Sequence, residues 1–121
     1  MAITAITSVQ EFDEKVLGSK GLAIVDFWAA WCEPCTVMRP EVEAVAERFE
    51  GQVEFFSVDA EDKNLRGILL KEDVDGIPSL VFFRDGKMLD SLVGYKKADM
   101  LESLIKEVCL LYTSDAADDL T

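Results

Sequence analysis

The chain has 121 residues, half of them apolar, and a formal net charge of −12 at pH 7. This length fits one domain with one hydrophobic core. The acidic balance argues against nucleic acid or an anionic membrane as a partner, because both attract lysine and arginine. The sequence contains no histidine, which excludes a Cys–His or Ser–His catalytic pair within the chain.

Apolar periodicity predicts strands that alternate with helices and end in a hairpin. In chain order, the predicted elements are a strand at 3–7, a helix at 9–17, a strand at 21–29, a helix at 34–49, a strand at 52–60, a helix at 64–71, strands at 79–83 and 88–95, and a helix at 98–108. This order implies an α/β fold with a central mixed β-sheet flanked by helices.

Local residues also predict where some of these elements begin, bend or turn. Ser8 is the expected N-cap of the first helix, with Glu11 as its capping-box partner. Pro40 lies inside the long second helix and is expected to kink it. Asp85 and Gly86 form a turn signal between the last two strands.

Two of the three cysteines, Cys32 and Cys35, lie between the apolar strand and the long helix. A helix N-terminus stabilises a thiolate, and this spacing lets one sulfur attack a disulfide while the other resolves the product. Pro34 suits the first helical turn and stiffens the loop. A structural zinc site would need more ligands than this pair supplies. A permanent structural disulfide is unusual in a cytoplasmic chain, so dithiol redox chemistry is favoured over both alternatives.

Asp26 interrupts the apolar strand six residues before Cys32. A carboxyl group at this point is expected to be buried beneath the cysteines, and burial raises the pKa of a carboxyl group. Such a group suits a general base that takes the proton of Cys35. The alternative is a carboxylate at the end of the strand, in contact with water.

The last residues, 109–121, change in character, because the helical apolar stripe stops and small and acidic residues follow. The stretch CLLYTSDAADD also resembles the translated sequence of a sequencing-library adapter. We therefore interpret residues 109–121 as a non-native tail of disordered or irregular structure. In that interpretation Cys109 has no functional role. A natural disordered tail is the alternative.

An ordered set of motifs identifies residues 1–108 with a known family. The motifs are VDFWAAWCEPC at 25–35, Pro40, GIPSLVFF at 76–83, DGK at 85–87 and VGY at 93–95. Together they resemble the thioredoxin family of small bacterial-type dithiol–disulfide oxidoreductases, and the resemblance implies a thioredoxin fold.

The resemblance also implies residue roles. Cys32 is expected to be the attacking thiol, Cys35 the resolving thiol and Asp26 the buried proton acceptor. Pro78 corresponds to a cis-proline that faces the disulfide, although an ordinary trans proline at a strand entry is the alternative. The residues expected to contact substrate are Trp31, Glu33, Pro34, Ile77, Val93 and Gly94. For Val93, plain core packing is the alternative.

The expected function is reduction of protein disulfides by a cytoplasmic monomer. By resemblance, an NADPH-dependent flavoenzyme of the thioredoxin-reductase type would return the electrons. No metal and no bound cofactor are expected besides the redox-active disulfide. Two alternatives are a protein disulfide oxidant or isomerase, and a non-catalytic binding module of the same fold. A signal peptide and an apolar membrane span are both absent from the sequence pattern.

Three positions depart from the usual pattern of the family. Glu33 replaces a glycine, and its carboxylate is expected to oppose ionisation of Cys32. Ser57 aligns with a lysine that usually accompanies the buried aspartate, so Asp26 should hold its proton more tightly unless another group compensates. Asp73 and Asp75 make the segment before Gly76 more acidic than usual, which suggests a role in partner selection.

Overall fold

Five strands form one mixed sheet in the order β1–β3–β2–β4–β5. The computed structural model describes residues 3–113 of the chain. Its strands are β1 (Ile3–Ala5), β2 (Leu22–Trp28), β3 (Val53–Asp59), β4 (Ser79–Arg84) and β5 (Lys87–Val93). β3 pairs in parallel with β1 and β2, whereas β4 pairs antiparallel with β2 and β5. The predicted central mixed sheet is thereby confirmed.

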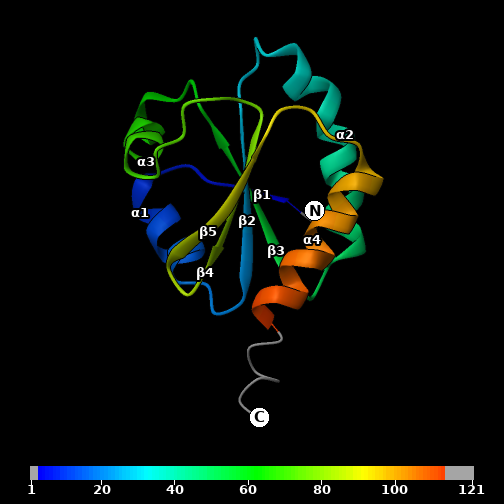
Figure 1. Cartoon of the computed structure of the whole chain (residues 1–121). Helices are drawn as coiled ribbons and strands as arrows, with labels where there is room; N and C mark the ends of the chain where they lie inside the picture. Colours follow the sequence, from blue (N-terminus) through cyan, green and yellow to red (C-terminus); the bar gives the residue numbers. More distant parts are fainter. Residues whose placement is uncertain (1–2, 114–121) are drawn as a thin grey trace.

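Helices cover both faces of this sheet, as Figure 1 shows: α1 and α3 lie on one face, and α2 and α4 on the other. The helices are α1 (Val9–Phe12), α2 (Glu33–Arg48), α3 (Arg66–Lys71) and α4 (Ala98–Thr113). Alternate residues of β2 therefore enter two separate apolar clusters, Ile24 on the α2/α4 side and Val25 and Phe27 on the α1/α3 side. This double coverage explains why the strand reads as an almost continuous apolar run.

The hairpin turn follows its sequence signal. Asp85 and Gly86 both have positive φ, 53° and 82°, between β4 and β5. Two successive positive φ values are what a type I′ two-residue hairpin loop requires, and Asp-Gly adopts them at low cost. The turn thus returns β5 along the outer side of β4.

Two helices differ from their predicted form. The first begins as expected at Val9, but a π-helical turn over Asp13–Leu17 replaces its second half. The last helix continues through Thr113, so residues 109–113 are helical where irregular structure was expected. Cys109, the first residue after the predicted end of the helix, is half-buried and packs against the α2/α4 cluster. The remainder of the expected tail, 114–121, lies outside the described residues.

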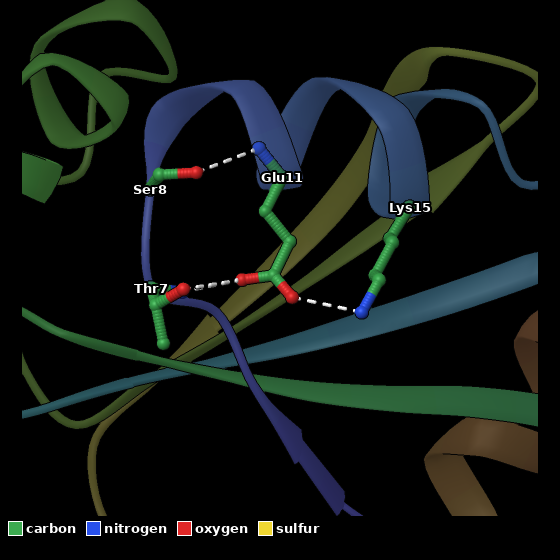
Figure 2. Close-up of polar contacts among 4 residues, drawn as sticks. All are labelled: Thr7, Ser8, Glu11 and Lys15. Carbon is green, nitrogen blue, oxygen red and sulfur yellow. Dashed lines mark hydrogen bonds and ion pairs between the residues drawn. The ribbon is translucent and has the colours of Figure 1, made fainter.

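Polar side chains at the N-terminus of the first helix form hydrogen bonds and an ion pair with one another, as Figure 2 shows. The Ser8 hydroxyl accepts a hydrogen bond from the Glu11 N–H at 3.0 Å, as predicted for an N-cap. The Glu11 carboxylate accepts from the backbone N–H and hydroxyl of Thr7, one residue before the cap, and pairs with Lys15 at 2.8 Å. These contacts lower the pKa of Glu11 to about 2.

Candidate active site

Helix α2 begins with the cysteine pair. Cys32 is the N-cap residue, with extended backbone, and its sulfur accepts a hydrogen bond from the Cys35 N–H at 3.2 Å. The turn that joins β2 to this cap is closed by the Cys32 N–H, which donates to the Ala29 carbonyl. Both cysteines are buried, and their sulfurs form a disulfide across a Cα–Cα distance of 5.2 Å. The sequence therefore places both sulfurs within the first turn of the helix.

This position favours negative charge on sulfur. The first N–H groups of a helix have no partner within the helix and lie at the positive end of its dipole. The N–H of Cys35 already points at the Cys32 sulfur. In the reduced protein the same N–H can stabilise a Cys32 thiolate, which is the nucleophilic form of cysteine.

Asp26 lies on the face of β2 that α2 covers, and only 4% of its surface is exposed. Its burial was predicted, and the alternative of a water-exposed carboxylate is wrong. Burial raises the pKa of this carboxyl group to about 6, an effect that the positive charge of Arg39 partly opposes. One carboxylate oxygen, Oδ1, has no hydrogen-bond partner among residues 3–113, and the other, Oδ2, faces Arg39.

Arg39 is the residue of this site that sequence reasoning missed. Its guanidinium lies 4.0 Å from the Asp26 carboxylate and 5.2 Å from the centre of the Trp28 ring. Its position four residues after Cys35 on one helix was the available signal, because residues with this spacing share a helix face. Ser57, the position that suggested a missing cation, is buried next to Asp26 on β3.

The loop before β4 brings a second set of residues to the cysteines. The Ile77–Pro78 peptide is cis, as the resemblance implies, and Ile77 packs against the buried cysteines. The Gly94 N–H donates to the Pro78 carbonyl at 2.8 Å, which places the end of β5 beside this loop. Gly94 has φ of 101°, a conformation that favours glycine.

Two of the side chains expected to bind substrate are apolar and exposed to solvent. Trp31 is 68% exposed and Val93 is 55% exposed, so core packing does not account for Val93. Glu33 and Pro34, the two residues between the cysteines, are also exposed. The structure thus places the expected substrate-binding residues on the surface, except for Ile77 and Gly94, which are half-buried.

Residues 3–113 contain no group of three or more His, Cys, Asp or Glu side chains that could hold a metal ion. Within the same residues, no helix is long and apolar enough to cross a membrane.

A five-stranded mixed sheet with a Cys-x-x-Cys disulfide at a helix N-terminus defines a class of dithiol–disulfide proteins, and comparison with known proteins specifies the family. The family model for thioredoxin matches residues 3–107. Thioredoxins of Staphylococcus aureus, from strains Mu50 and MW2 among others, are 34% identical over 105 residues, which cover 87% of this chain and 96% of each relative. A thioredoxin structure from Malassezia sympodialis matches with a TM-score of 0.78 and 28% identity, covering 87% of this chain and 89% of that one.

The chain belongs to the thioredoxin family, which confirms the resemblance and the fold predicted from the motifs. It is a thiol–disulfide oxidoreductase of the protein-disulfide reductase type, with Cys32 and Cys35 as its redox pair. The redox interpretation of the cysteine pair is thereby confirmed over the zinc site and the structural disulfide.

Proposed function

We propose that the chain is a cytoplasmic reductant of protein disulfides in which Cys32 attacks, Cys35 resolves and Asp26 accepts the proton. The observation that supports this assignment best is the position of the disulfide at the N-terminus of α2, with the buried carboxyl group of Asp26 on the strand beneath that helix. The Cys35 N–H that points at the Cys32 sulfur favours Cys32 as the thiolate.

The reaction would begin from the reduced dithiol. The Cys32 thiolate attacks one sulfur of the substrate disulfide, a mixed disulfide forms, and the other substrate sulfur leaves as a thiolate. Asp26 then takes the proton of Cys35, whose thiolate attacks the Cys32 sulfur and releases the second substrate thiol. Two electrons have passed to the substrate, and the protein is left with the Cys32–Cys35 disulfide.

Substrate would dock on the exposed apolar surface around the disulfide. Trp31 and Val93 supply its most exposed apolar area, with Pro34 beside the cysteines. Ile77 packs against the cysteines beside Pro78, and the hydrogen bond from the Gly94 N–H to the Pro78 carbonyl holds the end of β5 next to it. A reductase of the flavoenzyme type would use this surface to return electrons, with the chain acting as a monomer and without a bound cofactor.

Reduction of insulin by dithiothreitol, with catalytic amounts of the protein, tests this function. The wild type is expected to accelerate insulin precipitation, and Cys35→Ser is expected to abolish turnover because its mixed disulfide is not resolved. Cys109→Ser is the matched control, because Cys109 lies on α4 and packs against the α2/α4 cluster. This variant should keep full activity. A wild type as inactive as Cys35→Ser would favour the non-catalytic binding module.

The redox potential of the Cys32–Cys35 couple separates a reductant from an oxidant or isomerase. Equilibration with glutathione measures it, because the direction of exchange in a compartment depends on this potential. A potential well below that of glutathione supports the reductant. A potential above it would contradict the proposal and favour the oxidant.

A further inference from the structure

Two residues of α2 and two residues of β2 face each other behind the disulfide. Cys35 and Arg39 are four residues apart and share a helix face. Asp26 and Trp28 are two residues apart and share a face of the sheet. Contacts join the pairs, because the Arg39 guanidinium reaches both the Asp26 carboxylate at 4.0 Å and the Trp28 ring at 5.2 Å. Trp28 in turn packs against the buried cysteines.

No other charged group compensates the buried carboxylate from the elements packed around it in the described part of the chain. The register partners of Asp26 are Ser57 on β3 and Leu80 on β4, both uncharged. On α2, Glu41 accepts a hydrogen bond from the backbone at the start of α4. In the loop before α4, the Lys96 ammonium donates to a carbonyl at the end of β5. Asp59, the register partner of Trp28 on β3, carries a negative charge and accepts a hydrogen bond from the Glu61 N–H at 2.9 Å. The reduced cysteines are further titratable groups at this site.

The guanidinium is fixed by its second contact. Stacking on the Trp28 indole gives a cation a favourable electrostatic position above the ring, and arginine makes this contact more often than lysine. The Arg39 side chain is 28% exposed, so its charge acts on Asp26 through a partly dehydrated gap. The same charge opposes the effect of burial on the pKa of Asp26.

We propose that Arg39 is the positioning residue that keeps Asp26 charged behind the Cys32–Cys35 disulfide, and that stacking on Trp28 holds it there. The inference rests on the proposed function, in which charged Asp26 accepts the proton of Cys35. Without the guanidinium, a larger fraction of the buried carboxyl group would be protonated near and below neutral pH, and that fraction could not act as a base. The contacts of Arg39 are with Asp26 and Trp28, so its proposed effect on the reaction passes through Asp26.

The test compares Arg39→Met, which removes the charge, with Arg39→Lys, which keeps it. Arg48→Met is the matched control, because Arg48 is on the same helix but pairs with Glu102 and Asp99 of α4. We expect insulin reduction by Arg39→Met to fall about three- to fivefold at pH 6 and to recover by about pH 8.5, since a neighbouring opposite charge moves a carboxyl pKa by about one unit. Arg39→Lys should lie between Arg39→Met and the wild type, and Arg48→Met should follow the wild type.

A second readout separates this role from a merely structural one. The infrared carboxyl band that disappears in Asp26→Asn follows the titration of Asp26 in the oxidised protein, without turnover. Its midpoint should move to higher pH in Arg39→Met and stay unchanged in Arg48→Met. The proposal would be overturned if the infrared midpoint and the pH–rate profile of Arg39→Met both matched those of the wild type. It would also be overturned if the midpoint of Arg39→Lys moved as far as that of Arg39→Met. If the wild type fails to reduce insulin, the proposed function fails, and the infrared titration still decides the role of Arg39.

Discussion

The N-termini of α1 and α2 use the same capping geometry for different purposes. In α1, the Ser8 oxygen accepts from the N–H three residues later at 3.0 Å, and in α2 the Cys32 sulfur does the same at 3.2 Å. Around Ser8 the polar groups satisfy one another, because Glu11 binds Thr7 and Lys15. At the start of α2, the capping atom is the Cys32 sulfur, which is covalently bonded to the Cys35 sulfur.

The carboxyl groups of Glu11 and Asp26, one near each of these caps, have pKa values shifted in opposite directions. Exposed contacts with Lys15 and Thr7 lower the pKa of Glu11 to about 2, whereas burial raises the pKa of Asp26 to about 6. The hydrogen-bonded carboxylate of Glu11 contributes to stability, whereas a buried carboxyl group whose pKa is raised toward neutral pH is suited to proton transfer. The position of a capping residue therefore does not determine its role, which depends on the atom at the cap and on the group buried behind it.

Replacing the sulfur cap by an oxygen cap should have the largest effect. Cys32→Ser keeps a good N-cap residue, so the reduced variant should unfold at nearly the same denaturant concentration as the reduced wild type. Its insulin reduction should be lost completely, because the attacking thiolate is gone. Activity assays and chemical denaturation of the two reduced proteins measure both effects. Turnover by Cys32→Ser would contradict the assignment of the nucleophile.

Asp26→Asn should stabilise the protein at neutral pH. The pKa of Asp26 is raised in the folded state from 3.8 to about 6, so the folded protein is more stable below pH 3.8 and loses this stability as the pH rises through 6. The variant avoids this loss and should gain about 2–3 kcal/mol in free energy of unfolding at pH 7.5. Near pH 3 the gain should vanish. Denaturant titrations at the two pH values measure the difference.

Glu11→Gln is the control for this experiment, because its change in free energy of unfolding should have the opposite sign. Because the pKa of Glu11 falls from 4.5 to about 2 on folding, its contribution is present above pH 4.5 and is lost as the pH falls through 2. The variant should therefore be less stable than the wild type at pH 7.5 and approach it in acid. Matching pH dependences of the two variants would show that the two carboxyl groups do not differ as described.

Ser8→Ala should have a smaller effect that is confined to stability. Loss of the hydroxyl that accepts from Glu11 should cost about 1 kcal/mol in free energy of unfolding. Insulin reduction should not change, because α1 and the disulfide belong to different apolar clusters. Urea denaturation and the insulin assay, run on the same preparation, check both statements. A loss of activity in the folded variant would show that the two helix termini are coupled.

Glu33→Gly should have the smallest effect. The Glu33 carboxylate lies next to Cys32 on the exposed surface, so its charge opposes formation of the thiolate but is screened by solvent and salt. The variant should show a slightly lower pKa of Cys32 in the reduced protein, followed by the ultraviolet absorbance of the thiolate. An equal or higher pKa in the variant would refute the effect of Glu33, and high salt should reduce the difference.

Local patterns predicted the features that depend on neighbouring residues. Ser8 as a cap, the Asp85–Gly86 turn and the cysteines at the start of α2 all follow from spacing within one segment. The end of α4 was missed, because the helix continues through Thr113 and the packing of Cys109 against the core is a tertiary contact that the local pattern does not show. The π-helical turn at Asp13–Leu17 was also missed, and the apolar periodicity of that segment does not distinguish it from an ordinary helix.

The sequence by itself determined the order of strands and helices, the redox pair and the burial of Asp26, because apolar runs and the Cys-x-x-Cys spacing are local. Only the tertiary structure decided what faces that carboxyl group. Arg39 lies thirteen residues beyond Asp26 on another element, and the packing of α2 on β2 brings the guanidinium to 4.0 Å from the carboxylate. Electrostatic compensation of a buried group depends on distance in space, which spacing along the chain does not give.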